Sequence, residues 1–291
     1  MIKVHDSFRD LPEDPAGRFL ANRWAFFREF FLEPTGGLLE EYWRASGITG
    51  ELRAAIEGER GFSVVWAMDR YRSLPKGALE HAVRASAGVL GDLDASVYLV
   101  PGLFAANAMT VFLGGTAVAV ICLEQNGGAE DLCACMAHEL SHVALSRSYT
   151  GPVTVGLALF SEGLATAAAL KALEGYRAGP VADPDLAAVL WYPPEVLEWC
   201  REHEARLWRT ARPVLDSENR NHHHDLLAKF SGDFWKDDGT PYRAGYYLGY
   251  VAVADLLESG VTLSQAHRMP GPAMTTALVR RAQKATGPGT T

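Results

Sequence analysis

The segment from Met136 to Ala144 has the sequence Met-Ala-His-Glu-Leu-Ser-His-Val-Ala and contains the pattern His-Glu-x-x-His. Its two histidines, His138 and His142, are four residues apart, so on a helix both imidazoles project from one face and can reach the same metal ion. Zinc suits this geometry, with Zn–N bonds of about 2.0–2.1 Å. Glu139 is one position round from the first histidine, where its carboxylate could take a proton from a water beside the metal. The motif therefore predicts a zinc site with a general base.

The ordinary alternative is a pair of hydrogen-bonded histidines on a helix that holds no metal. The residues around the motif are apolar, which predicts that this helix packs in the core rather than on a solvated face. These residues are Leu132, Met136, Val143 and Ala144. A buried setting favours the metal site.

A third ligand candidate, Glu162, lies 20 residues after His142 in an apolar, alanine-rich run. Burying a carboxylate there is costly unless it has a partner, which points to a cation. The alternative is an exposed glutamate on an amphipathic helix, but little of this segment is polar. Two histidines and one carboxylate with an open fourth position describe a catalytic zinc site, since structural zinc is usually closed by four protein ligands.

His138-Glu139-x-x-His142 followed by Glu162 resembles the gluzincin metallopeptidases, the thermolysin and aminopeptidase group, in which a glutamate on the next helix completes the zinc site. Residues 161–165, Ser-Glu-Gly-Leu-Ala, are similar to the Asn-Glu-Gly-Phe-Ala type sequence around that glutamate in the aminopeptidases. Residues 245–250, Gly-Tyr-Tyr-Leu-Gly-Tyr, resemble the Gly-Tyr-x-x-Gly-Tyr element of the predicted zinc-dependent proteases of the YjaZ type. The resemblance covers roughly residues 95–260 and implies a peptidase with one Zn²⁺ ion.

The sequence departs from these families at two places. Thermolysin-like sequences carry an aspartate four residues after the ligand glutamate, which orients a ligand histidine; here Thr166 stands there, so another group must do this. The Gly-Ala-Met-Glu-Asn element that holds the substrate amine in aminopeptidases is absent. Aminopeptidase activity is therefore not implied, and endopeptidase-like hydrolysis is expected.

A site of this class usually needs a second donor for the oxyanion that forms during hydrolysis. Tyr246 and Tyr250 are four residues apart, lie on one helical face and are the candidates, ahead of Arg243. Tyr247 is on another face. The open alternative is that these tyrosines pack at a glycine-spaced contact between helices.

Two other clusters of histidine or cysteine are not expected to bind a metal. Three successive histidines, His222 to His224, cannot all face one ion from a regular element, and their polar neighbours indicate a solvated loop. A histidine on the substrate side is the alternative. Cys133 and Cys135 are about 200° apart on a helix, which favours buried, inert thiols over chelation.

No charged residue or histidine occurs between Asp94 and Glu124, a stretch long enough to cross a membrane. Proline, glycine and asparagine divide it into three segments of strand length, Ser96–Val100, Met109–Leu113 and Thr116–Leu123. Its flanks are acidic rather than basic, which favours buried sheet over a membrane span. In gluzincins a small sheet packs on the zinc helix and its edge strand can pair with substrate. The resemblance makes Thr116–Leu123 the candidate for that edge.

Helical periodicity lies on both sides of this stretch. Helices are expected over residues 15–34, 38–45, 49–57, 79–90, 130–147, 153–174, 186–211, 225–230 and 245–258, while Phe62–Met68 fits strand or helix. The prediction is an α+β fold, mainly helical, with a small mixed β-sheet packed on the His-Glu-x-x-His helix. We expect a helical region over residues 1–94, a metallopeptidase region over residues 95–286 in one compact unit, and a frayed tail over residues 287–291.

The chain has 291 residues, 48% of them hydrophobic and 21% charged, which is typical of a soluble globular protein. Its net charge of −8 disfavours nucleic acid as a partner, so a peptide or protein substrate is expected. The amino terminus shows no signal peptide, and the four cysteines are not spaced as a disulfide framework. A cytoplasmic, reducing setting without membrane contact is expected.

Three classes of function fit these observations. The first is a zinc metallopeptidase of the gluzincin type, and the second is a zinc-binding relative that regulates or binds without hydrolysis. Glu139 favours the first, because a purely structural site has no use for a carboxylate beside the metal. The third, a membrane-embedded protease, requires the uncharged stretch to be a membrane span.

Overall fold

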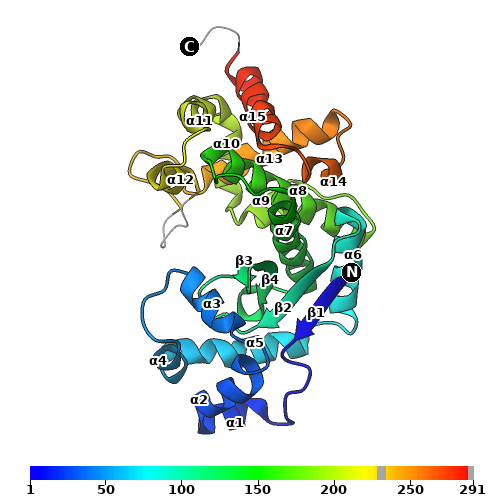
Figure 1. Ribbon diagram of the computed structural model, residues 1–291, viewed down its shortest axis with the longest axis vertical. Helices are drawn as coiled ribbons and strands as arrows, with labels where there is room; N and C mark the ends of the chain where they lie inside the picture. The colour runs from blue at the N-terminus through cyan, green and yellow to red at the C-terminus, as the bar shows by residue number, and fades with distance from the viewer. Residues whose placement is uncertain (228–233, 288–291) are drawn as a thin grey trace. The chain divides into compact units, whose positions relative to one another are not determined.

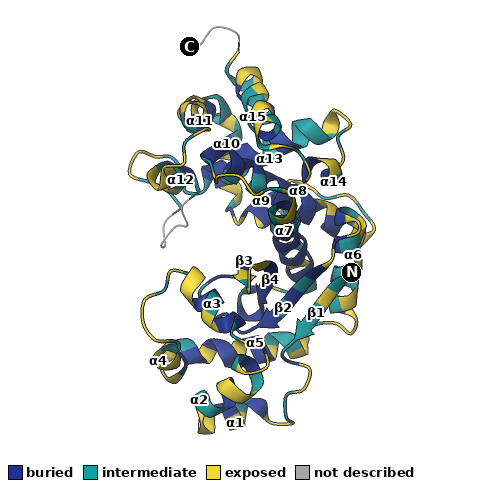
Figure 2. Cartoon of the chain, viewed as in Figure 1, coloured by how far each residue is buried: buried dark blue, intermediate teal, exposed yellow. Residues whose placement is uncertain are grey.

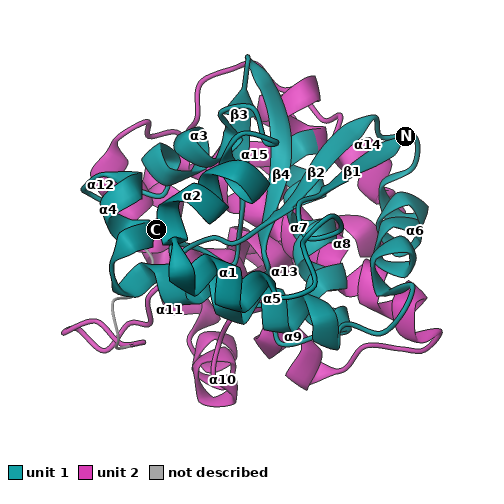
Figure 3. Cartoon of the chain, turned by 90° about the horizontal axis from the view of Figure 1, so that it is seen from below, with its two compact units in different colours: residues 1–143 teal, residues 144–291 magenta. Residues whose placement is uncertain are grey.

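The structure is a computed structural model that describes residues 1–227 and 234–287 (Figure 1). Within these residues the chain has a mainly helical α+β fold with a four-stranded mixed sheet, as the sequence predicts. It divides into two compact units, Met1–Val143 and Ala144–Thr291, which Figure 3 colours separately. The expected boundary at residue 94 is wrong, because the amino-terminal helices and the sheet belong to the same unit.

The sheet of the first unit has the strand order β1-β2-β4-β3. β1 (Ile2–Asp6), β2 (Ala95–Val100) and β4 (Thr116–Cys122) are parallel, and β3 (Ala108–Leu113) is antiparallel to β4. β1 lies in the region expected to be helical, and it pairs with β2 along its whole length. The uncharged stretch is therefore sheet, as predicted, and not a membrane span.

The expectation that Thr116–Leu123 forms the edge of the sheet is wrong. β4 lies between β2 and β3, and every residue of this strand after Thr116 is buried (Figure 2). A continuous apolar strand is typical of a position covered on both faces. Gly114 and Gly115, with φ of 56° and 81°, make the tight turn that folds β4 back along β3. The edge next to β4 is β3, in which Ala108 and Val111 are buried and the other four residues are accessible to different degrees.

Six α-helices precede the sheet's second strand in the first unit. They are α1 (Pro15–Ala21), α2 (Arg23–Phe27), α3 (Leu38–Ala45), α4 (Leu52–Glu57), α5 (Phe62–Ser73) and α6 (Ala78–Leu90), with the short helical segments η1 (Arg28–Leu32) and η2 (Glu59–Gly61) between them. A third short segment, η3 (Leu123–Gln125), follows β4. Asp14 caps α1 by accepting a hydrogen bond from the Gly17 N–H at 3.0 Å. The ambiguous segment Phe62–Met68 is helical, as part of α5.

A buried carboxylate holds the loop between β2 and β3. Glu124 accepts hydrogen bonds from the backbone N–H groups of Gly102 and Phe104, each at 3.0 Å. Leu103 and Phe104 both have a φ of 55°, which is uncommon for residues other than glycine. The Tyr42 hydroxyl of α3 donates to the Gly102 carbonyl at 3.0 Å. Burial raises the pKa of Glu124 to about 7.

This carboxylate should make the stability of the protein depend on pH. The pKa of Glu124 is about 7 in the folded protein against an ordinary 4.5, so between these values the folded state keeps a proton that the unfolded state has released. Stability should therefore fall as the pH rises from about 4.5 to about 7, by up to about 3 kcal/mol, and then level off. Urea denaturation across this range measures the slope. Glu124→Gln should remove that part of it, and equal slopes in the two proteins would contradict the prediction.

The second unit is built of helices in its described residues. After the end of α7 (Ala129–Ser148) it contains α8 (Val155–Arg177), α9 (Asp183–Leu190), α10 (Pro194–Glu202), α11 (Glu204–Ala211), η4 (Arg212–Val214), α12 (Arg220–Leu227), α13 (Ala244–Glu258), α14 (Leu263–Ala266) and α15 (Gly271–Thr286). The expected helix over residues 186–211 is three helices, broken at two places. The expected helix over residues 225–230 and the expected tail over residues 287–291 fall partly outside the described residues.

α8 is the core helix of the second unit. Among the described helices it alone has the length and apolar composition to cross a membrane, and 78% of its most apolar window is buried. Within the second unit α8 packs most extensively against α13, and the two backbones touch through glycine. A Cβ atom on Gly163 would lie 2.2 Å from the Gly249 carbonyl oxygen, and one on Gly249 would lie 1.9 Å from that of Leu159. The glycine spacing in residues 245–250 thus serves this helix contact.

Gly163→Ala should destabilise the second unit, because its new methyl group collides with the α13 backbone rather than with a movable side chain. Overpacking of this kind costs about 1–3 kcal/mol or more. Gly175→Ala in the same helix is the matched control, since a Cβ there meets nothing within 4 Å. That variant should stabilise by up to about 1 kcal/mol. Thermal unfolding compares the two, and equal midpoints for both variants would contradict the close contact.

Candidate metal centre

α7 carries both histidines of the His-Glu-x-x-His motif on one face. The Nε2 atoms of His138 and His142 are 3.2 Å apart, and both side chains are half-buried. The two rings meet edge to face, with centroids 4.9 Å apart. The expected convergence of the two imidazoles on one point is confirmed.

The distance between these nitrogens can be compared with that of a zinc site. Two nitrogens bonded to one tetrahedral zinc ion at about 2.0–2.1 Å lie about 3.3 Å apart. The observed 3.2 Å therefore fits two ligands of one ion. It also fits a hydrogen bond in which one neutral imidazole donates to the other. Imidazole nitrogens are ligands that suit zinc and also copper, iron and nickel.

Glu139 is buried beside the first histidine, with only 7% of its surface exposed. Its carboxylate accepts a hydrogen bond from the Thr110 hydroxyl at 2.8 Å, and the same hydroxyl lies 3.1 Å from the Glu139 carbonyl oxygen. Thr110 is in the middle of β3, so the edge strand holds the candidate general base. Sequence reasoning missed Thr110, because its pairing depends on how the hairpin folds against α7.

The preceding loop makes a second contact with α7. The Asn107 side-chain amide donates to the Cys135 sulfur at 3.3 Å. Together with the Thr110 contact, this confirms that the sheet packs on the His-Glu-x-x-His helix. Burial raises the pKa of Cys133 and of Cys135 to about 12, so both thiols stay protonated. All four cysteines are free and buried, as expected of inert thiols.

Glu162 lies on α8, directly before the glycine that contacts α13. The ligand atoms of His138, His142 and Glu162 are all within 4.8 Å of one another. Among the described residues, this set of three side chains could hold a metal ion.

The candidate oxyanion donors, Tyr246 and Tyr250, lie on one face of α13, and both are partly accessible. The Arg243 guanidinium lies 4.1 Å above the ring of Tyr246. Tyr250 lines a separate cavity beside Asp183 and Arg201. Tyr247 is buried, its hydroxyl lies 3.3 Å from Glu204, and it lines the same cavity as Tyr250.

The expected surface loop at His222 to His224 is wrong. These residues belong to α12, because Asn219 caps the helix by accepting a hydrogen bond from the Asn221 N–H at 2.9 Å. His222 Nδ1 lies 2.8 Å from the Ser217 hydroxyl. Successive positions on a helix point in different directions, so the three imidazoles do not form a common ligand set.

Comparison of the chain with protein-family models, with curated proteins and with solved structures finds no match in any of the three. The resemblance to the gluzincins therefore stays a prediction from the motifs.

Proposed function

We propose that this protein is a zinc-dependent peptidase that hydrolyses peptide bonds with Glu139 as the general base. The observation that carries the proposal is the geometry of α7. Two imidazole nitrogens 3.2 Å apart lie next to a buried carboxylate that a strand of the sheet holds in place. Burying a carboxylate is costly, so packing alone does not explain why a helix would place Glu139 beside the two histidines.

His138, His142 and Glu162 would hold the zinc ion, leaving one position open to solvent or substrate. When bound, zinc supplies a Lewis acid that polarises a carbonyl group and makes a neighbouring water more acidic. No thiol contributes, because the cysteines are protonated and buried.

The side chains around the ion have separate tasks in this proposal. Glu139 takes a proton from the attacking water and can return it to the leaving amine. Thr110 holds the Glu139 carboxylate in one orientation through its hydrogen bond. Tyr246 remains the candidate donor to the oxyanion, whereas Tyr250 lines the cavity beside Asp183 and Arg201.

We assign substrate binding to β3 instead of β4. β3 is the last strand in the sheet order, and an extended peptide can add to such an edge through backbone hydrogen bonds. Thr110 lies on this same strand, so a peptide along β3 would pass the residue that holds Glu139.

The second candidate is a zinc-binding protein that regulates or recognises without hydrolysis. It needs the two histidines and Glu162 but gives Glu139 no chemical task. The buried, hydrogen-bonded position of Glu139 favours the peptidase.

The proposal is tested by measuring bound zinc and cleavage of a mixed peptide library by the purified chain. Zinc at one equivalent, cleavage that stops with a chelator and returns with added zinc, and new termini inside peptides would support it. Stoichiometric zinc without any cleavage would favour the non-hydrolytic alternative. A chain that binds no zinc would overturn both.

Thr110→Val should lower kcat by about tenfold to a hundredfold, as loss of a group that orients an active-site residue typically does. Valine keeps the shape of threonine but cannot donate to Glu139. KM and zinc content should change little, because the hydroxyl contacts neither histidine in this arrangement. Thr110→Ser keeps the donor and should recover most of the activity. Equal losses in both variants would mean that packing, not the hydrogen bond, matters at this position.

A further inference from the structure

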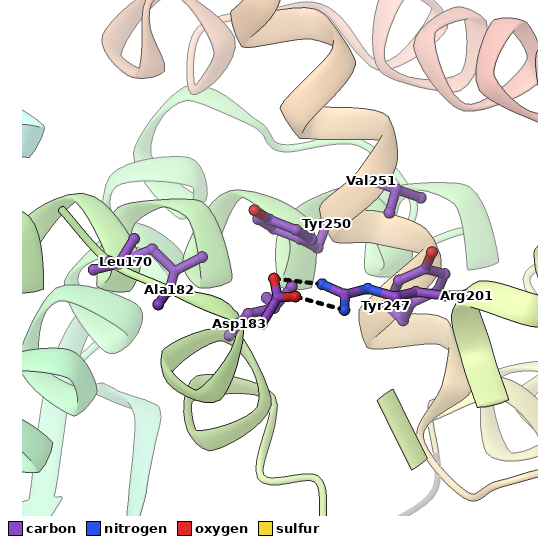
Figure 4. Close-up of a pocket in the computed structure, with 9 residues that line it drawn as sticks. Leu170, Ala182, Asp183, Arg201, Tyr247, Tyr250 and Val251 are labelled. Carbon is purple, nitrogen blue, oxygen red and sulfur yellow. Dashed lines mark hydrogen bonds and ion pairs between the residues drawn. The ribbon is translucent and has the colours of Figure 1, made fainter. Parts of the chain in front are cut away.

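The second unit contains a cavity of about 240 Å³ lined by residues of α8, α9, α10 and α13 (Figure 4). Its lining is about equally polar and apolar, and the apolar part comes from the buried Leu170 and Leu186, the half-buried Val251 and the ring of Tyr247. Cavities that hold drug-sized ligands measure roughly 300–1,000 Å³, so this one suits a single side chain.

An ion pair forms the polar part of the cavity. Both terminal nitrogens of Arg201 donate to the Asp183 carboxylate, at 2.9 and 2.7 Å. Figure 4 shows this pair next to the ring of Tyr250. The Asp183 side chain is 71% exposed, so its carboxylate can accept further hydrogen bonds beside those from Arg201.

The charges around this pair are mainly negative. Burial raises the pKa of Tyr250, and the charges of Asp183, Glu258 and Glu174 raise it further against the opposing effect of Arg201. Arg201 lies 3.8 Å from a fourth carboxylate, Glu198, and Lys171 pairs with Glu174. Carboxylates therefore outnumber cations, which favours a ligand with a positive end.

We infer that this cavity binds the basic side chain, lysine or arginine, of a peptide. The aliphatic stem lies between Leu170 and Val251, and the cationic end reaches Asp183 and the Tyr250 hydroxyl. Long basic side chains pair an apolar stem with a charged head, which matches these two parts of the cavity. The role as a specificity pocket for substrate rests on the proposed peptidase function, whereas the binding itself does not.

Two probes test the binding: Nα-acetyl-L-lysine N-methylamide and its norleucine analogue, which has the same backbone and an uncharged stem. Titration into the Glu139→Gln protein, followed by NMR, measures both dissociation constants without turnover. The lysine probe should bind about threefold to fivefold more tightly, the effect of an exposed ion pair. Asp183→Asn should remove this preference, and Val251→Trp, which fills the cavity, should weaken both probes. Glu195→Gln, on the exposed side of α10, should change neither.

Equal binding of both probes, a preference that survives Asp183→Asn, or unchanged binding to Val251→Trp would overturn the inference. Cleavage of a mixed peptide library separates it from the proposed function. Lysine and arginine at a fixed position relative to the cut, lost in Asp183→Asn, would support the specificity role. Binding as expected without any cleavage would keep the site and reject the peptidase. Cleavage without a preference for lysine or arginine, together with equal binding of the two probes, would support the peptidase and reject the binding site.

Discussion

Replacing Glu139 by glutamine should lower peptide hydrolysis by about 100-fold to 10,000-fold, the usual contribution of a general base. Glutamine has nearly the same shape and can still accept the Thr110 hydrogen bond, but it cannot take a proton from water. The two histidines are untouched, so zinc content should stay at the wild-type level. Initial rates on a peptide found in the library, with zinc measured in the same samples, give both values.

The control for this variant is Glu195→Gln, which makes the same chemical change on an exposed turn of α10. It should hydrolyse peptides like the wild type. If Glu139→Gln is equally active, Glu139 is not the base and the proposed mechanism is wrong.

Replacing Glu162 by alanine should weaken zinc binding by at least about 100-fold, since it removes one of three protein ligands from the ion. The ligand atoms of this residue and of the two histidines lie within 4.8 Å of one another. Loss of any one of these side chains would leave the ion with only two protein ligands. Competition with a chromophoric chelator measures the affinity. Hydrolysis should fall in parallel and recover partly at high zinc concentration.

Glu174→Ala is the matched control, because this glutamate lies on the same helix and pairs with Lys171 at the surface. It should bind zinc like the wild type. Unchanged affinity in Glu162→Ala would mean that another group completes the site.

The local parts of the site could be predicted from the sequence. His138, Glu139 and His142 lie within one turn and a half of one helix, so helical geometry alone brings the imidazoles together. The glycine, proline and asparagine residues of the uncharged stretch likewise separate the segments that form β2, β3 and β4. Contacts between distant segments could not be predicted. Thr110 reaches Glu139 only because the hairpin folds against α7 in one register, and no local pattern records that register.

Two errors about the sheet have different causes. β1 is a short strand with Lys3, His5 and Asp6 among its five residues, and its partner β2 comes about 90 residues later. Its sequence therefore carries little strand signal of its own. The sequence of β4 itself argues against an edge position, because an unbroken apolar run predicts a central strand. That expectation came from the resemblance rather than from the residues.

The glycine contact between α8 and α13 also gives this protein a searchable signature. Glu162 is followed at once by Gly163, and the facing helix supplies glycine at positions 245 and 249. A side chain at Gly163 or Gly249 would collide with the opposite backbone, so a diverged chain can change the residues around them more easily than these glycines. A pattern of His-Glu-x-x-His, then Glu-Gly, then Gly-x-x-x-Gly should find distant relatives whose remaining residues have diverged too far for alignment.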